Sequence, residues 1–286
     1  MATALARITA NIGGPGEKRR RMYASVVMSV ILYGAPIWAQ TVVGNRKIVK
    51  EVDKLLRQLA LRVIRGYRTV SYDAGAILSG MVPFELAADR LRRSYIKRRE
   101  IISRDGAISP RASAILGEVE RRRSVARWRD RLAGLPLHGP GALIRGAFVE
   151  DLELWMGRAH GALTYRITQI LTGHGVFEAY LFRIERRDSP ICVYCRAAQD
   201  TSVHTLLFCP FWAEQREELL GLIGNNRTLK AVVSAIVRSS EAWGVFANTC
   251  ENIMRRKEED ERAWERGLIP QLGEPVLPVM DDVDDE

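Results

Sequence analysis

The sequence predicts an all-α protein of two helical lobes, with a small cysteine-rich module in the second lobe and a disordered acidic C-terminal tail. Apolar residues recur at three- and four-residue steps, and no alternating apolar and polar run is long enough for a multi-strand sheet. Residues 134–141, GLPLHGPG, combine the strongest turn-forming residues and indicate a linker. Three of the four cysteines fall between residues 192 and 209, which indicates a local module.

The first lobe, residues 1–133, is expected to be basic and helical. Its predicted helices cover residues 17–33, 45–65, 71–79, 83–103 and 110–132. Ile48, Val52 and Leu55 fall on one face of the second of these helices, which is the pattern of an amphipathic surface helix. Ser71 can cap the third helix, and Pro83 is suited to the first turn of the fourth.

Residues 22–45 carry no charge and follow the basic run at 18–21, a length and flank that suit a membrane-spanning helix. Gly34 and Pro36 interrupt this stretch, and polar residues are distributed along it. We therefore expect a core helix at 17–33, apolar on most sides and buried, and no membrane partner. A membrane anchor remains an alternative.

The second lobe, residues 142–267, is also helical. Its predicted helices cover residues 142–159, 163–171, 210–223, 229–237 and 242–265, with the cysteine-rich module at 190–212. The tail, residues 268–286, is rich in proline and acid and is expected to be solvated. Six of the 34 acidic residues and no basic residue lie in the last thirteen positions, so residues 1–273 carry a formal charge of +15.

A body this basic favours a polyanionic partner. Two predicted helices concentrate the positive charge, and few acidic residues flank these runs to neutralise them. We predict phosphate contacts from them, because arginine pairs with phosphate through two parallel hydrogen bonds. The predicted nucleic-acid-binding residues are Arg92, Arg93, Lys97, Arg98, Arg121, Arg122, Arg123 and Arg127. The alternative is a solvated helix face. The shorter basic runs at 19–21 and 255–257 are expected to be ordinary surface.

Cys192, Cys195, His204 and Cys209 form a C-x2-C-x8-H-x4-C pattern. A tight turn brings two cysteines at this spacing within reach of one ion, and three thiolates with one imidazole suit tetrahedral zinc. Four protein ligands leave no open position, which indicates a structural ion. Pro210 suits the first position of a helix, with Cys209 as its N-cap. Ordinary buried or free cysteines and a redox pair are the alternatives.

Three stretches carry a family resemblance, and they occur in the family's order: LYGAPIW at 32–38, LTGHGVFEAYLFRI at 171–184, and DSPICVYC followed by HTLLFCPFW, ending at residue 212. They resemble the C-terminal region of non-LTR retrotransposon reverse transcriptases, like the Pol polyproteins of type-1 retrotransposable elements of insects. The resemblance implies a segment running from the thumb, after the polymerase palm, through the C-terminal CCHC zinc knuckle. The parent family consists of RNA-directed DNA polymerases with an endonuclease.

The expected function is to bind the element's RNA or its DNA target. The second expected partner is the rest of the polyprotein. No catalytic residue is expected in this chain. The polymerase motif needs paired aspartates on a hairpin, whereas VMDD at 279–282 lies in the acidic tail. The alternative is a zinc-stabilised fragment that binds a protein partner and no nucleic acid. Sparse, clustered cysteines favour a nuclear or cytoplasmic location over secretion.

Overall fold

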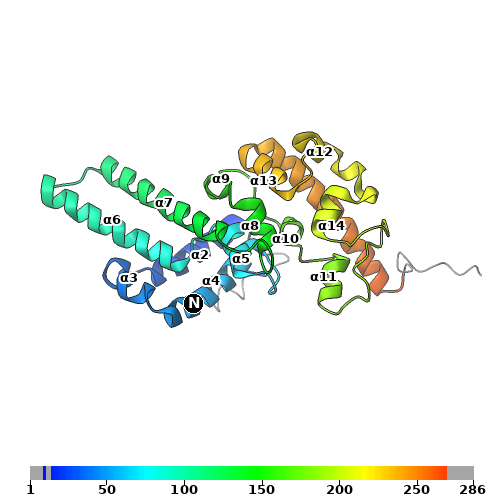
Figure 1. Ribbon diagram of the computed structural model, residues 1–286, viewed down its shortest axis with the longest axis horizontal. Helices are drawn as coiled ribbons and strands as arrows, with labels where there is room; N and C mark the ends of the chain where they lie inside the picture. Colours follow the sequence, from blue (N-terminus) through cyan, green and yellow to red (C-terminus); the bar gives the residue numbers. More distant parts are fainter. Residues whose placement is uncertain (1–8, 11–13, 269–286) are drawn as a thin grey trace, which may run out of the picture.

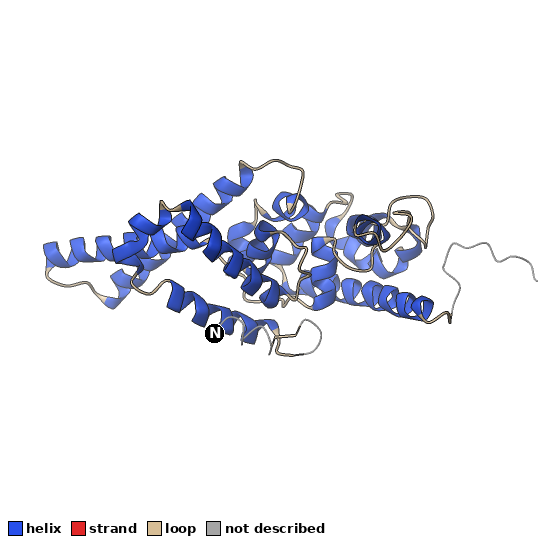
Figure 2. Cartoon of the chain, turned by 90° about the horizontal axis from the view of Figure 1, so that it is seen from below, coloured by secondary structure: helices blue, strands red, loops and turns tan. Residues whose placement is uncertain are grey.

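The structure is a computed structural model that describes residues 9–10 and 14–268. The predicted all-α fold is confirmed: no strand occurs in these ranges, and Ile191 and Gln199 form an isolated antiparallel bridge. The helices pack into an elongated body (Figures 1 and 2). The predicted disordered tail lies almost entirely outside the described residues, as does VMDD.

One end of the body is formed by a long helical hairpin, α6 and α7, with α2, α3 and α4 packed beside it (Figure 1). These helices are α2 (Glu17–Ile31), α3 (Ala35–Val43), α4 (Arg46–Ile64), α6 (Phe84–Asp105) and α7 (Pro110–Ala133). Local signals set their limits. The Asn45 side chain accepts hydrogen bonds from the backbone of Lys47 and Ile48 and so begins α4. Ser109 caps α7 in the same way.

The expectation that the helix at 17–33 is buried on most sides is wrong. Gly34, in the left-handed conformation at φ 67°, separates α2 from α3, and the two helices are bent by 83°. Met22, Val26 and Val30 are 54%, 47% and 59% exposed, so α2 buries only one face. In the described part of the chain no single helix is long and apolar enough to span a bilayer, and only the bent α2–α3 pair meets that test together.

The centre and the opposite end contain the remaining helices (Figure 1). They are α5 (Tyr72–Ser79), α8 (Ala142–Phe148), α9 (Leu152–Gly157), α10 (Tyr165–Thr172), α11 (Glu178–Arg183), α12 (Glu217–Ile223), α13 (Leu229–Arg238) and α14 (Ser240–Glu265). The largest apolar cluster joins α5 and α7 to α8, α10 and α14. It therefore includes residues on both sides of 134–141, and the division into lobes there stays a prediction.

Two predicted helices are broken. The helix expected at 142–159 divides into α8 and α9, and the buried rings of Phe148 in α8 and Trp155 in α9 pack edge to face, with ring centroids 4.7 Å apart. The helix expected at 210–223 begins as short 3₁₀ turns and becomes α-helical only at Glu217. Within these 3₁₀ turns, the side chain of the buried Arg216 donates to the carbonyl oxygen of Trp212 at 3.2 Å.

Candidate metal centre and basic surface

The four predicted metal ligands lie on two tight local structures. In the first, the backbone N–H of Arg196 donates to the carbonyl oxygen of Cys192 at 2.8 Å, closing a turn that brings Cys195 back over Cys192. Arg196 takes the left-handed conformation at φ 55°. The N–H of Cys192 donates to the carbonyl of Ala198, also at 2.8 Å. This turn is the first half of the module.

The second half is a single widened helical turn, a π-helix at His204–Phe208. The Thr201 hydroxyl accepts from the N–H of His204 at 3.0 Å, and the N–H of Cys209 donates to the carbonyl oxygen of His204 at 2.7 Å. The second of these hydrogen bonds joins residues five positions apart, as in any π-helix, and so brings His204 and Cys209 to the same side of the turn. As expected, Pro210 then opens the next turn with Cys209 as its N-cap, although that turn is 3₁₀ and not α-helical.

The four side chains converge on one point. One ligand atom from each of Cys192, Cys195, His204 and Cys209 lies within 4.8 Å of all the others. The sulfurs of Cys192 and Cys209 are 3.9 Å apart, and the sulfur of Cys195 is 3.3 Å from Nε2 of His204. Bonds of about 2.3 Å in a tetrahedron place two sulfurs about 3.8 Å apart, so the donor set has the size of a zinc site. None of the cysteines forms a disulfide.

Burial makes unliganded thiolates costly here. Cys192 and Cys209 are fully buried. Burial, with the nearby carboxylate of Asp200 adding to it, raises the pKa of Cys192 to about 12, and burial also raises the pKa of Cys209. Burial lowers the pKa of His204, which favours the neutral imidazole that a metal binds. A divalent cation would supply the positive charge that two buried thiolates lack, so the cluster can hold a metal ion.

A buried ion pair supports the module from the side of α14. Nζ of Lys257 lies 2.7 Å from Oδ2 of Asp200, and the two side chains are 2% and 0% exposed. Asp200 also accepts from the hydroxyl of Thr205 at 2.6 Å and from the N–H of Glu178 at 3.0 Å. The Lys257 ammonium lies 4.9 Å from the ring centre of Tyr194, and Tyr194 stands between the first two cysteines in the sequence. The pair thus joins both halves of the module to α14.

Sequence reasoning missed this lysine, and the expectation that residues 255–257 are all surface is wrong. Arg255 and Arg256 are exposed, but Lys257 is buried. The expectation for residues 19–21 is wrong in the same way at Arg20, which is 1% exposed and donates to the carbonyl oxygens of Pro15 and Arg62. In both runs the buried residue follows the spacing of apolar neighbours on its helix, which was the available signal.

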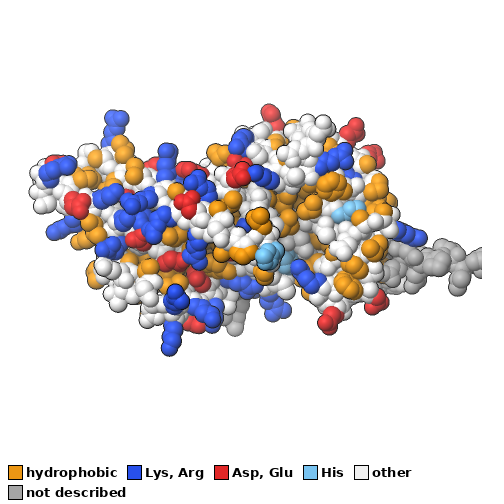
Figure 3. Space-filling model, in the orientation of Figure 1, with side chains coloured by type: hydrophobic (Ala, Val, Ile, Leu, Met, Phe, Trp, Pro, Cys, Tyr) orange, Lys and Arg blue, Asp and Glu red, His pale blue; other side chains and the backbone are white. Residues whose placement is uncertain are grey.

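The eight predicted nucleic-acid-binding residues lie on α6 and α7, which pack against each other. The premise that few acids neutralise them is wrong. Figure 3 shows acidic side chains among the basic ones at this end of the molecule. Five of the eight form ion pairs: Arg93 with Asp89 and Glu120, Lys97 with Glu120, Arg121 and Arg122 with Glu118, and Arg127 with Asp89.

The other three predicted residues form no ion pair with any described residue. Arg92 donates to the Gln40 side chain at 3.0 Å, and Arg98 donates to the Ser113 hydroxyl at 2.7 Å. Arg123 forms no ion pair with any described residue. The same is true of Arg99, a further exposed arginine of α6. Among the described residues, the exposed arginines of the hairpin without an acidic partner are therefore Arg98, Arg99, Arg111 and Arg123, and the remaining positive charge is partly neutralised within the protein.

No family model matches the chain, and no solved structure matches it. Among curated proteins, the Pol polyprotein of type-1 retrotransposable element R1 4 from Nasonia vitripennis is 24% identical over 238 residues, covering 82% of this chain. That of element R1 3 from the same organism is 24% identical over 92% of the chain, and that of element R1 from Bradysia coprophila is 25% identical over 73%. The chain is a distant relative of these Pol polyproteins.

The match covers only part of each relative: 59% of the R1 4 polyprotein, 73% of the R1 3 polyprotein and 21% of the Bradysia polyprotein. The relationship to insect retrotransposon Pol polyproteins agrees with the resemblance found in the sequence. It extends well beyond the three motifs, because they lie between residues 32 and 212 and the matches cover most of the chain.

Proposed function

We propose that this chain is a nucleic-acid-binding C-terminal segment of a non-LTR retrotransposon reverse transcriptase polyprotein, running from the thumb through the CCHC zinc knuckle. It binds the element's RNA or its DNA target and lacks the polymerase and endonuclease active sites. The observation that carries the proposal is the similarity to insect Pol polyproteins over most of the chain, in a protein that also assembles a Cys3His cluster. Reduced thiols in that cluster fit a nuclear or cytoplasmic location.

In this proposal the ion is zinc and its role is structural. The donor set supplies three thiolates and one neutral imidazole, which leaves no position for a substrate. Bound zinc fixes the turn at Cys192 and the π-helix at His204 relative to each other. The Asp200–Lys257 pair then holds both against α14. The chain's own residues therefore orient the knuckle, and the polymerase chemistry belongs to another part of the polyprotein.

The α6–α7 hairpin provides the phosphate contacts in this proposal. Exposed arginines without acidic partners offer free guanidinium groups, and phosphate contacts give affinity without reading sequence. Arg98, Arg99 and Arg123 are three of these, and the ion-paired arginines contribute only when phosphate displaces their carboxylates. The surrounding polyprotein, which is the second expected partner, would hold the bound strand at the polymerase.

The first prediction concerns these three free arginines. Replacing Arg98, Arg99 and Arg123 with glutamine keeps good helix formers and breaks no ion pair, so the stability of the fold should change little. The slope of log K against log salt should flatten by about 0.7 per lost contact on single strands and 0.9 on duplex, roughly two to three units in all. Fluorescence anisotropy over a salt series measures it. An unchanged slope would assign these arginines to solvent alone.

The second prediction is that removing the charge of Glu118 strengthens nucleic-acid binding. Hydrogen bonds from Arg121 and Arg122 lower the pKa of Glu118 to about 2, so this carboxylate stays charged at physiological pH and occupies both guanidinium groups. Glu118→Gln should release Arg121 and leave Arg122 only its 3.7 Å pair with Glu153, so nucleic-acid binding should strengthen several-fold and the salt slope should steepen by about 0.7 to 0.9 per new contact. Titration of the same labelled strand checks it. Weaker binding by this variant would contradict a role for α7 in phosphate contact.

A second candidate function is a zinc-stabilised fragment that binds a protein and no nucleic acid. The internal neutralisation of Arg93, Lys97 and Arg127 favours it, as does the exposed apolar face of α2 and α3. A chain that binds no nucleic acid at any salt concentration would select this function. Solubility that depends on detergent would instead select the membrane alternative for the α2–α3 pair.

A further inference from the structure

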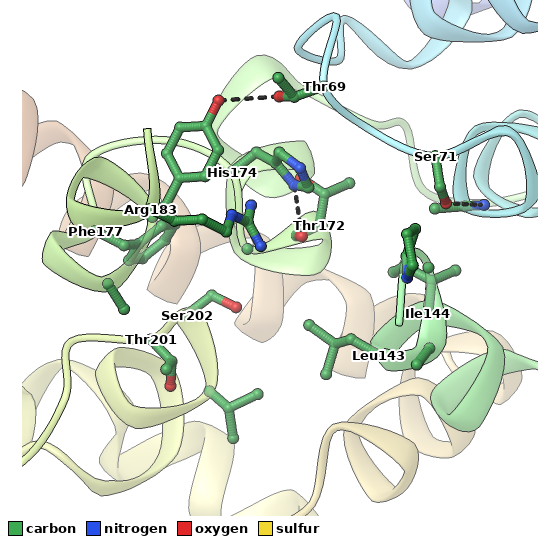
Figure 4. A pocket seen from close by; sticks show the side chains of 18 of the residues that line it. Thr69, Ser71, Leu143, Ile144, Thr172, His174, Phe177, Arg183, Thr201 and Ser202 are labelled. Atoms are coloured by element: carbon green, nitrogen blue, oxygen red, sulfur yellow. Dashed lines mark hydrogen bonds between the residues drawn. The ribbon is translucent and has the colours of Figure 1, made fainter. Parts of the chain in front are cut away.

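A cavity of about 810 Å³ lies beside the knuckle (Figure 4), and neither the four predicted metal ligands nor any residue of α6 or α7 lines it. Four stretches of chain that are distant in sequence enclose it: the segment before α5, the loop entering α8, the TGHG turn with α11, and the start of the knuckle's second half. Its volume lies within the range of about 300 to 1,000 Å³ that is typical of small-molecule sites.

Two walls of the cavity are bare backbone. Gly141 and Gly173 take the left-handed conformation, at φ 80° and 68°. A Cβ at Gly141 would lie 2.4 Å from the Ser71 hydroxyl, so no side chain fits there. A Cβ at Gly173 would project to 3.4 Å from the Ser202 hydroxyl and 3.8 Å from Leu143, into the cavity itself. Glycine at these positions keeps the space open.

The polar groups of the cavity favour an anion. No acidic residue lines it, whereas Arg183 does, and Arg183 has no acidic partner among the described residues. Its guanidinium lies 5.2 Å from the ring centre of Tyr180. Ser202 is only 2% exposed, yet its hydroxyl forms no hydrogen bond with any described residue, and Figure 4 shows it directed toward the same space as Arg183. The hydroxyl of a buried residue and the guanidinium of the exposed Arg183, neither with a hydrogen-bonding or acidic partner among the described residues, are complementary to phosphate.

The rest of the lining is mostly apolar and aromatic. Leu143 and Ile184 contribute aliphatic surface, and the rings of His174 and Tyr180 lie 4.9 Å apart. Nδ1 of His174 donates to the carbonyl oxygen of Thr172 at 2.7 Å, which fixes the ring, and Tyr180 is held through the hydroxyl of Thr69 at 2.9 Å. This surface suits a flat aromatic base more than a bare anion.

We infer that this cavity binds one nucleoside phosphate, with the phosphate on Arg183 and Ser202 and the base against the apolar and aromatic wall. The ligand is either an unpaired nucleotide of a bound strand or a free nucleotide. The choice of a nucleotide over other aromatic anions rests on the proposed function. The site is distinct from the hairpin, so its contribution to binding can be separated from that of Arg98, Arg99 and Arg123.

The experiment measures binding of the full chain to single-stranded oligo(dT) and to thymidine monophosphate. Arg183→Gln should weaken both about tenfold and flatten the salt slope for oligo(dT) by about 0.7. Ser202→Ala should weaken both about fivefold. Arg186→Gln is the matched control, because Arg186 is 59% exposed, lies outside the cavity, and makes only a 3.5 Å pair with Glu265. It should bind like the unmodified chain. Circular dichroism and metal content should be the same in all variants.

The outcomes separate the claims. Arg183-dependent binding of oligo(dT) identifies a nucleotide within a strand as the ligand, and Arg183-dependent binding of thymidine monophosphate alone identifies a free nucleotide while contradicting the proposed function. If the chain binds oligo(dT) but Arg183→Gln behaves like Arg186→Gln, the cavity inference is wrong and the proposed function stands. Competition by inorganic phosphate that equals competition by thymidine monophosphate would overturn the role of the base.

Discussion

Cys192→Ser should abolish metal binding and unfold the turn that carries Cys192 and Cys195. The sulfur of Cys192 is fully buried and lies 3.9 Å from that of Cys209, so a serine there removes one of four ligands from a closed site. The Asp200–Lys257 pair and the buried Leu206 and Leu207 hold the second half of this segment, whereas the turn at Cys192 has only its own backbone hydrogen bonds and the isolated bridge between Ile191 and Gln199. In structural zinc sites the binding free energy is folding free energy, so the loss should be on the order of 5 kcal/mol or more.

Elemental analysis of the purified chain should give one zinc per molecule before the change and none after it, and urea unfolding followed by tryptophan fluorescence should report the loss of stability. Cys250→Ala is the matched control. Cys250 is equally buried but belongs to the main apolar cluster, so this variant should keep its zinc and lose only about 1 kcal/mol. A chain without zinc, or Cys192→Ser with its zinc retained, would refute the metal site.

Lys257→Met should destabilise the protein by about 3 to 5 kcal/mol, because it leaves the carboxylate of Asp200 buried without its counter-charge. The remaining hydrogen bonds to Asp200, from Thr205 and from the N–H of Glu178, do not neutralise it. Because the pair connects the knuckle to α14, we also expect weaker zinc retention against a chelator. Thermal and urea unfolding, with a chelator competition series, measure both effects.

Two variants test the cause of that loss. Asp200→Asn combined with Lys257→Met removes both charges and should recover a large part of the stability, since replacing a whole buried pair costs much less than breaking it. Lys230→Met breaks the pair between Lys230 and Glu150, whose side chains are 50% and 67% exposed, and should cost less than about 1 kcal/mol. Equal losses in Lys257→Met and Lys230→Met would show that the buried pair has no special role.

The sequence by itself determined the all-α class, the limits of most helices and the four side chains of the Cys3His cluster. These features are local. Helix caps such as Asn45 and Ser109 act within three residues, and the ligands from Cys192 to Cys209 lie within eighteen residues, so their spacing along the chain nearly sets their spacing in space. The similarity to Pol polyproteins was visible for the same reason, because its motifs are short and continuous.

Only the tertiary structure decided which charges are free and where the segments meet. Glu120 neutralises Arg93 and Lys97 from the facing helix, and Asp200 pairs with Lys257 across 57 positions of sequence. The cavity at Arg183 likewise needs four separate stretches of chain. Helical periodicity specifies which face of a helix is apolar, but the partner of that face, and of each charge beside it, depends on packing between residues that are far apart in the chain.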